Sequence, residues 1–258
     1  MKKTFALLLA LVLALTCLTA CGSSSDSDLK YIQKKGTMIV GITDYAPMDY
    51  KDENGNWTGF DAEMAELVCK ELGVKCEFFV LADWGKKFYE LETKNIDAIW
   101  NGMTITDEVT LNTNCTAPYV VNAQVLVMKA DAVGNYTDTA SLSGLTFAVE
   151  SGSAGEAVIA DLEYDYTPVK AQSDALMEVA AGTSDAAVID LLMAMAMTGE
   201  DTSYEDLTYT IELNSEEYGV GFRKDSDVTA KVNEIMDKLK ADGTMQALAD
   251  KYSLTLAD

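Results

Sequence analysis

The side chains that usually perform catalysis are sparse in this sequence. The chain has five cysteines and no histidine. Histidine is the commonest general base and the usual partner of a nucleophilic serine or cysteine, so these arrangements and most zinc sites are excluded. The cysteine spacing matches no metal-binding pattern, and no cofactor or metal is expected. The residue types therefore favour a protein that binds a ligand over one that catalyses a reaction.

The chain is strongly acidic. It has 42 aspartates and glutamates against 19 lysines and arginines in 258 residues, for a formal net charge of -23. A nucleic-acid-binding protein needs a basic face to displace counterions, so that class is excluded. Hydrophobic residues make up 48% of the chain, which is enough to bury a core in one large or two modest domains.

The N-terminal segment has the pattern of an export signal. Two lysines precede the apolar run Phe5 to Leu15, which is too short for a permanent membrane anchor. Leu18-Thr19-Ala20-Cys21 then resembles the bacterial lipobox, in which the cysteine is lipidated and becomes the new N-terminus. We expect a signal peptide over residues 1–20, a lipid on Cys21 and a flexible tether over residues 21–28. The alternative is an ordinary signal peptide with an incidental cysteine.

Cys69 and Cys76 are close enough in the sequence to form a disulfide outside the cytoplasm. Cys69 falls late in a predicted helix and Cys76 opens the apolar segment Cys76 to Leu81. Gly73 lies between them and can end the helix and turn the chain. The alternative is a pair of reduced, buried thiols. Cys115 has no partner in this pattern and is expected in the core.

Strand-like and helix-like segments alternate along the rest of the chain. Strands are predicted at 37–42, 78–81, 98–100, 119–128, 146–149 and 186–189, and helices at 61–72, 86–94, 155–162, 173–181, 190–198 and 228–239. Asp61 and Ser173 are the predicted N-caps of two of these helices. Two rounds of alternation separated by one long β segment predict two α/β lobes. Such lobes bind ligands at the carboxyl ends of their strands, here the loops after Ile42, Trp100, Val149 and Ile189.

Short motifs occur along the chain in the order of one protein family. They include Tyr45-Ala46-Pro47, Gly59-Phe60-Asp61, Gly102-Met103-Thr104-Ile105-Thr106, Pro118-Tyr119, Ser151-Gly152-Ser153, the strand Asp185 to Asp190, and Gly219 to Asp225. Each is weak alone. Together, over residues 29–256, they resemble the bacterial extracellular solute-binding proteins of family 3, the amino-acid receptors of ABC importers. The spacing of Cys69 and Cys76 also resembles that of basic-amino-acid receptors in this family.

The resemblance implies a bilobal, type II periplasmic-binding-protein-like α/β fold in which two hinge strands join the lobes. Lobe I would hold residues 29–120 and 217–258, lobe II residues 125–212, and the hinge residues 119–124 and 209–216. The protein would be monomeric, extracytoplasmic and lipid-anchored to the bacterial cell membrane, and it would not be an enzyme. It would deliver a small amino acid or related amine to an ABC importer permease with its ATPase. A sensor domain and a dehydratase-like enzyme on the same fold are the alternatives.

The resemblance also implies ligand-binding roles for residues in several loops. Tyr45 and Trp84 would form aromatic walls, and Asp190 would accept from the ligand's ammonium or cap the following helix. Asp44 would add negative charge unless it serves only its turn, and Trp100 would line the pocket or belong to the core. Backbone groups would hold the ammonium and carboxylate, from Asn101, Gly102 and Thr104 in one lobe and from Gly152, Ser153 and Ala154 in the other.

Position 109 departs from the family pattern. Relatives carry an arginine there that clamps the ligand's carboxylate, whereas this chain has Val109. The one arginine of the chain, Arg223, lies in a strand motif and is assigned to the fold. The ligand is therefore either an amino acid whose carboxylate is held by loop amides alone or a small amine without that carboxylate. Asp190 favours a positive charge on the ligand in both cases.

The substitution Cys21→Ala tests the predicted anchor. It removes the atom that would carry the lipid, so the protein should be released from the membrane or accumulate as an unprocessed precursor. Cell fractionation and lipid labelling measure both effects. A variant that is labelled and retained like the wild type would contradict the lipobox interpretation.

Overall fold

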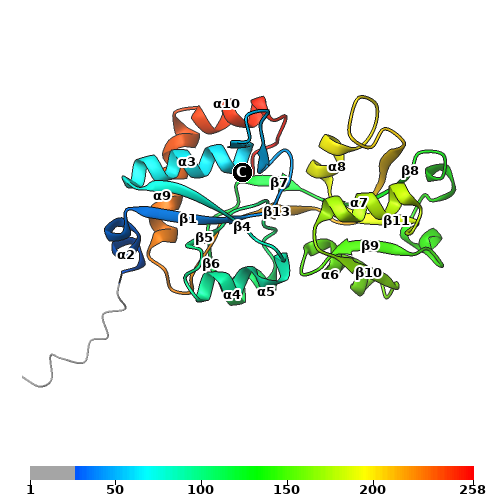
Figure 1. The fold of residues 1–258 in the computed structure, drawn as a ribbon, viewed down its shortest axis with the longest axis horizontal. Coiled ribbons are helices and arrows are strands. Elements are labelled where there is room, and N and C mark those ends of the chain that lie inside the picture. The colour runs from blue at the N-terminus through cyan, green and yellow to red at the C-terminus, as the bar shows by residue number, and fades with distance from the viewer. Residues whose placement is uncertain (1–26) are drawn as a thin grey trace, which may run out of the picture.

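Residues 27–258, the part of the chain that the computed structural model describes, fold into two α/β lobes (Figure 1). The expected signal peptide, the cysteine expected to carry the lipid (Cys21) and most of the expected tether lie outside the described residues. No helix within residues 27–258 has the length and apolar character that crossing a membrane requires.

Lobe I is a five-stranded sheet with helices on both faces (Figure 1). Its strands follow the order β4 (Lys75–Val80), β1 (Thr37–Ile42), β5 (Ala98–Ile99), β14 (Gly221–Phe222) and β6 (Asn114–Cys115). β1 runs parallel to β4 and β5, whereas β14 runs antiparallel to β5 and β6. The helices are α2 (Asp28–Lys35), α3 (Phe60–Leu72), α4 (Lys87–Glu92), α5 (Asp107–Asn112), α9 (Val228–Ala241) and α10 (Thr244–Lys251). A small hairpin of β2 (Tyr50–Lys51) and β3 (Trp57–Thr58) precedes α3.

Lobe II is a second five-stranded sheet. Its strands follow the order β10 (Tyr166–Val169), β9 (Phe147–Glu150), β11 (Ala186–Asp190), β8 (Gln124–Lys129) and β12 (Leu207–Glu212), and its helices are α6 (Ala154–Asp161), α7 (Gln172–Ala181) and α8 (Leu191–Met197). β9, β10 and β11 are parallel, so their carboxyl ends share one edge of the sheet. Glu150 and Asp190 are the last residues of two of these strands, and they therefore lie at the same edge.

Two chain crossings join the lobes and form the hinge. β7 (Val120–Asn122) pairs antiparallel with β13 (Glu216–Tyr218), and Figure 1 shows both between the two sheets. The predicted β segment 119–128 is divided at Ala123 into the hinge strand β7 and the lobe II strand β8. The second crossing begins later than the predicted residue 209, because Leu207–Glu212 pair with β8 inside the sheet of lobe II. The crossing therefore covers residues 213–218.

The two predicted N-caps are wrong. α3 begins at Phe60 after Gly59, whose φ of 116° and close approach to the Met48 carbonyl exclude a side chain. Asp61 lies in the first turn of α3 and is fully buried, so its carboxylate points into the lobe rather than over the helix end. α7 begins at Gln172, one residue before the predicted cap Ser173. The polar side chains Asp61 in the first turn of α3 and Gln172 in the first turn of α7 are both buried and form hydrogen bonds inside the protein.

Cys69 near the end of α3 and Cys76 in β4 lie side by side as free thiols. Gly73 caps α3 in the left-handed conformation and turns the chain between them, as predicted. The hydrogen-bonded Cys69 thiol and burial together raise the pKa of the Cys76 thiol. The cross-link between the two cysteines stays a prediction.

Alkylation of the denatured, unreduced protein measures the state of this pair. In protein isolated from an oxidising compartment, we expect one blocked site in residues 27–258, at Cys115. Intact-mass analysis after iodoacetamide treatment counts the sites, and a sample reduced beforehand provides the control. Three alkylated thiols without reduction would contradict the prediction. A disulfide that closes so short a loop should add about 2 kcal/mol of stability, and less if it is strained.

Candidate functional site

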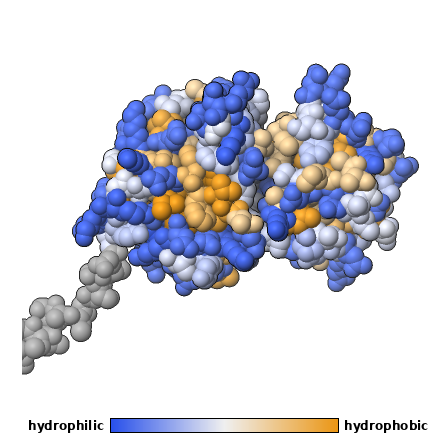
Figure 2. Space-filling view, viewed as in Figure 1, coloured by the Kyte–Doolittle hydropathy of each residue, from blue (hydrophilic) through white to orange (hydrophobic). Residues whose placement is uncertain are grey.

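A cavity of about 230 Å³ lies between the two lobes, near the hinge. Lobe I contributes Trp84, Lys87, Asn101, Gly102, Met103, Thr104 and Thr106 to Val109, and lobe II contributes Glu150, Gly152, Ser153, Ala154, Ala157, Gln172 and Asp190. Figure 2 shows the two lobes meeting at a narrower waist. Most of the residues predicted at the site therefore line one cavity, together with Lys87, Glu150 and Gln172, which had no predicted role.

Asp190 is the most firmly held of these side chains. It ends β11 and is 4% exposed. Its Oδ1 accepts from Asn122 Nδ2 at 2.6 Å and from Gln124 Nε2 at 2.7 Å, and its Oδ2 accepts from Gln172 Nε2. The side-chain oxygen Oε1 of Gln172 accepts in return from the backbone amide of Asp190 at 2.8 Å. The carboxylate makes no side-chain cap on α8, so the alternative role of a helix cap is not what the structure shows.

A second carboxylate lies beside Asp190 in the hinge. Glu216 Oε1 accepts from the same two amides, Asn122 Nδ2 at 2.7 Å and Gln124 Nε2 at 2.8 Å, and from Thr104 Oγ1 at 2.8 Å. The predicted ligand residue Thr104 thus has its hydroxyl bound to the hinge. Burial, and then the charge of Glu216, raise the pKa of Asp190 to about 7. The three side-chain amides that donate to Asp190 carry no charge. A cation in the cavity would therefore stabilise the ionised form of Asp190.

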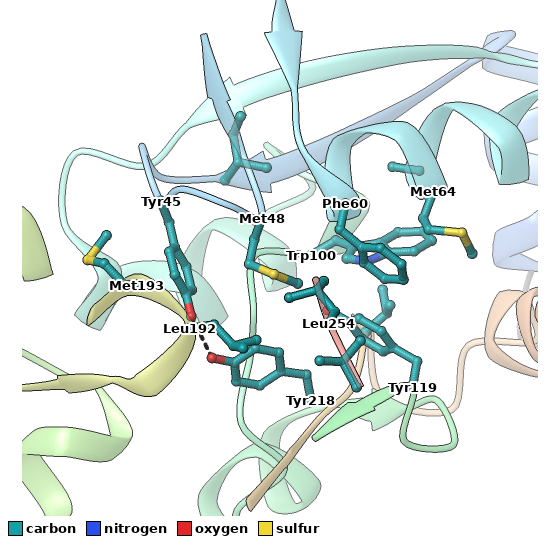
Figure 3. Close-up of a cluster of buried hydrophobic side chains, with 14 of the residues drawn as sticks. Tyr45, Met48, Phe60, Met64, Trp100, Tyr119, Leu192, Met193, Tyr218 and Leu254 are labelled. Atoms are coloured by element: carbon teal, nitrogen blue, oxygen red, sulfur yellow. Dashed lines mark hydrogen bonds between the residues drawn. The ribbon is translucent and has the colours of Figure 1, made fainter. Parts of the chain in front are cut away.

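Two of the predicted aromatic residues lie behind the cavity rather than in its wall. Tyr45 is 2% exposed and its hydroxyl bonds that of Tyr218 at 2.6 Å (Figure 3). Trp100 is fully buried and packs edge-on against Tyr119. Asp44 is exposed and outside the cavity lining. The direct ligand contacts predicted for Tyr45, Trp100 and Asp44 are therefore not supported by their positions. Figure 3 shows that Leu192 and Met193 of α8 reach this cluster from lobe II.

Gly102 fits tightly against the aromatic cluster. Its φ is 55°, and a Cβ at this position would come within 2.5 Å of the Tyr45 ring and 3.1 Å of the Tyr218 ring. The buried Asp61 holds the loop from the other side, because its Oδ2 accepts from the Gly102 amide at 2.6 Å and from the Tyr119 hydroxyl at 2.8 Å. Burial raises the pKa of Asp61 to about 7. The motif Gly59-Phe60-Asp61 was visible in the sequence, but its aspartate was interpreted as a helix cap.

Several backbone amides that were expected to hold a ligand carboxylate are already bonded within the protein. The Gly102 amide donates to Asp61, the Gly152 amide to Glu156 Oε2 at 2.7 Å, and the Ser153 amide to the Glu150 carbonyl at 3.2 Å. The Ser153 hydroxyl caps α6 instead of facing a ligand. The Asn101 side chain is bound to Thr43 through both of its polar atoms. Ala154 at the start of α6 lines the cavity as predicted.

Lys87 and Glu150 add charges that the sequence analysis missed. Lys87 is 3% exposed, and its Nζ lies 4.9 Å from the centroid of the Trp84 ring, which forms a wall as predicted. Glu150 is 4% exposed, and within residues 27–258 its carboxylate forms no hydrogen bond or ion pair. Burial, and then the charge of Asp190, raise the pKa of Glu150 to about 8. The sequence analysis assigns Lys87 only to a helix, and in the loop that begins at Glu150 it considers only backbone groups.

A cavity enclosed by two hinged α/β lobes and lined by buried charges is the architecture of a bilobal ligand-binding protein. Within residues 27–258 no cluster of histidine, cysteine and acidic side chains could hold a metal ion. Residues 38–255 match the family described as bacterial extracellular solute-binding proteins, family 3, and the chain belongs to that family.

Known relatives are similar to this chain over most of its length. It is 31% identical to the arginine-binding extracellular protein ArtP of Bacillus subtilis, over 98% of both chains. It is 29% identical to the lysine/arginine/ornithine-binding periplasmic protein of Escherichia coli, over 93% of this chain and 95% of that one. A crystal structure of the P235GK mutant of ArgBP from T. maritima has a TM-score of 0.81 and 30% identity, with 87% of this chain and 98% of that chain covered. The ancestral amino acid-binding protein AncCDT-1, described as a precursor of cyclohexadienyl dehydratase, has a TM-score of 0.79 and 30% identity, with 88% and 99% covered. The predicted bilobal fold is confirmed.

The buried carboxyl groups predict how stability depends on pH in the ligand-free protein. The pKa is raised to about 7 for Asp61 and Asp190 and to about 8 for Glu150, far above the values in an unfolded chain. The folded state therefore binds protons more tightly, and this contribution to stability is lost as the pH rises through 7 and 8. We expect the Tm to rise by a few degrees as the pH falls from about 8 to about 5.

Differential scanning fluorimetry of the wild type and of the double variant Glu150→Gln/Asp190→Asn measures this contribution. The double variant should show a flatter profile, because two of the titrating groups are gone. Burial lowers the pKa of Lys87 to about 8, which acts in the opposite sense but mainly above pH 8. Equal slopes for the two proteins between pH 5 and pH 8 would contradict the assignment.

Proposed function

We propose that this protein is the substrate receptor of an ABC importer, and that Asp190 binds the ammonium group of an amino-acid ligand. The observation that carries the proposal is the environment of Asp190. Its carboxylate is buried, bonded to three side-chain amides, and next to the second acid Glu216. A charge-assisted hydrogen bond to an ammonium would offset the cost of burying this charge when the lobes enclose the ligand.

The charges around the cavity favour a ligand without surplus negative charge. Asp107, Glu108, Glu150 and Asp190 line the cavity, against one basic side chain, Lys87, among the described residues. A zwitterionic ligand gives Asp190 a partner, and a ligand with a second cationic group could also give Glu150 one. Two of the relatives are named for binding arginine or lysine, arginine and ornithine. A cationic or zwitterionic amino acid is therefore proposed in preference to a dicarboxylate.

Capture without turnover is the proposed activity. The relatives named above are binding proteins, and the chain has no histidine to act as a general base. The proposed location is the outer side of the bacterial cell membrane, with a lipid on Cys21 as the anchor and delivery of the ligand by the monomer to the permease. The likeness to AncCDT-1 is the observation that would favour a dehydratase-like reaction instead. Incubation with the bound amino acid and analysis for new products distinguishes these two activities.

The lobes already touch across the cleft. Lys87 Nζ of lobe I donates to the Gly152 carbonyl of lobe II at 2.8 Å, and a Cβ on Gly152 would lie 2.7 Å from the Gly85 Cα. A ligand between the lobes would add contacts to both and shift the population toward the closed form, which the permease would then recognise.

Substitution of Asp190 tests the proposed ammonium site. A thermal-shift screen of the common amino acids and their amines first identifies the ligands, and calorimetry then gives the Kd. Asp190→Ala and Asp190→Asn should weaken binding by about 10- to 100-fold, or about 1.5–3 kcal/mol, since a charged hydrogen bond is lost. Val109→Ala should cost much less, because it removes no charged bond.

Asp165→Asn provides the control, since it removes one negative charge from an exposed position of lobe II. Its affinity should match that of the wild type. In the screen, amines and cationic or zwitterionic amino acids should rank above glutamate and aspartate. Tight glutamate binding that survives Asp190→Ala would overturn the assignment.

A further inference from the structure

The carboxylate of an amino-acid ligand lacks its expected partner in this chain. Val109 is 3% exposed and packs in an apolar cluster with Trp84 and Phe88, so its place offers no charge. Three of the loop amides expected to hold the ligand's carboxylate, those of Gly102, Gly152 and Ser153, are bonded within the protein and so give it no support. An anionic group brought into this cavity would be costly unless another cation met it.

Lys87 places a cation at this same wall. It begins α4, lines the cavity together with Val109, and its Nζ lies 4.6 Å from the centroid of the Phe88 ring. Glu108, the residue before Val109, is the first of the charges that act on the Lys87 ammonium. The side chain therefore brings a positive charge from a different helix to the region around position 109.

The Lys87 ammonium has hydrogen-bonding capacity to spare. Of its three donors, one is used by the Gly152 carbonyl, and within residues 27–258 no carboxylate forms an ion pair with it. Asp83, Glu108, Glu150 and Glu156 act on it from a greater distance and favour its charged form. Because a buried ammonium without an ion pair is unfavourable, an incoming carboxylate would be stabilised strongly.

We propose that Lys87 binds the carboxylate of the amino-acid ligand and replaces the arginine that position 109 lacks. The inference rests on the proposed function, in which Asp190 binds the ammonium of the same ligand. Both side chains line one cavity, with Asp190 on lobe II and Lys87 on lobe I. A ligand that bridges them would connect the two lobes by its two charged groups.

Pairs of probes that differ only in the carboxylate test this role. The probes are L-arginine with agmatine, L-lysine with cadaverine, and L-histidine with histamine, each measured by calorimetry. The wild type should bind at least one of these amino acids about 10- to 100-fold more tightly than its amine. Lys87→Met should remove most of that preference by weakening the amino acid and leaving the amine within about threefold. Lys87→Arg should keep the preference.

Lys86→Met is the matched control, because the neighbouring Lys86 is exposed and, among the residues that the structure describes, forms an ion pair only with Asp83 at the surface. Its amino-acid and amine affinities should both equal those of the wild type. If Lys87 only held Gly152 in place, Lys87→Met would lower the affinities for the amino acid and for the amine alike, and this result would overturn the proposal. Equal affinity of the wild type for amino acid and amine would also overturn it, whereas loss of both ligands in Asp190→Asn would leave the proposed function intact.

The pH dependence of the affinity is a second, independent test of the role of Lys87. Burial lowers the pKa of Lys87 to about 8, so the free lysine loses its charge as the pH rises through that value. A bound carboxylate would stabilise the charged form, so affinity for the amino acid should fall by about tenfold more in the wild type than in Lys87→Arg between pH 7 and pH 9.5. The ligand's own titration is common to both proteins. Parallel profiles would overturn the role of Lys87, and failure of these six probes and of every amino acid and amine in the thermal-shift screen to bind would overturn the proposed function with it.

Discussion

The pair of carboxylates at the hinge, the buried Asp190 and the partly buried Glu216, is the constraint around which the rest of the molecule is arranged. Two amide groups, those of Asn122 and Gln124, donate to both acids at once. Amides orient the carboxylates but leave their charge uncompensated, and the charge of Glu216 makes Asp190 harder to ionise. Thr104 ties lobe I to the same network, so the site of the excess charge is also the place where the lobes and both hinge strands meet.

A rigid support on lobe I faces this network. The loop at Gly102 is held by Asp61 from one side and lies against Tyr45 and Tyr218 from the other. Tyr218 belongs to the hinge strand β13, and its aromatic neighbours continue into the core of lobe I. The loop position therefore depends on packing that is independent of any ligand, whereas Asp190 sits on the opposite lobe. A ligand held by both sides is consequently sensitive to how far the lobes have closed.

The sequence predicts the framework of this arrangement well and its side-chain directions poorly. Alternating strands and helices, and polar residues placed directly after strands, are local patterns, and they were sufficient for the two lobes and for the position of Asp190. Whether an aromatic residue such as Tyr45 or Trp84 forms core or cavity wall depends on which neighbours cover it, and no local pattern contains that. Asp61 was misread because an aspartate at a helix start can cap the helix or turn inward. Lys87 was overlooked because a lysine in a short helix usually faces solvent, and only the packing of α4 against Trp84, Phe88 and the opposite lobe buries it.

Charge also explains why capture and closure should be coupled. In an open cleft, water solvates Asp190, Glu150 and Lys87, so their charges cost little free energy. Closure removes that water, so the same groups oppose the closed form until opposite charges replace it. An ammonium at Asp190 and a carboxylate at Lys87 would supply those charges together, and each would gain more from the closed form than from the open one. The difference in affinity between the two forms, rather than the total number of contacts, sets how far a ligand shifts the population. An acidic cleft of this kind therefore discriminates among ligands at the moment of closure, because a dicarboxylate would add repulsion where a cationic amino acid relieves it.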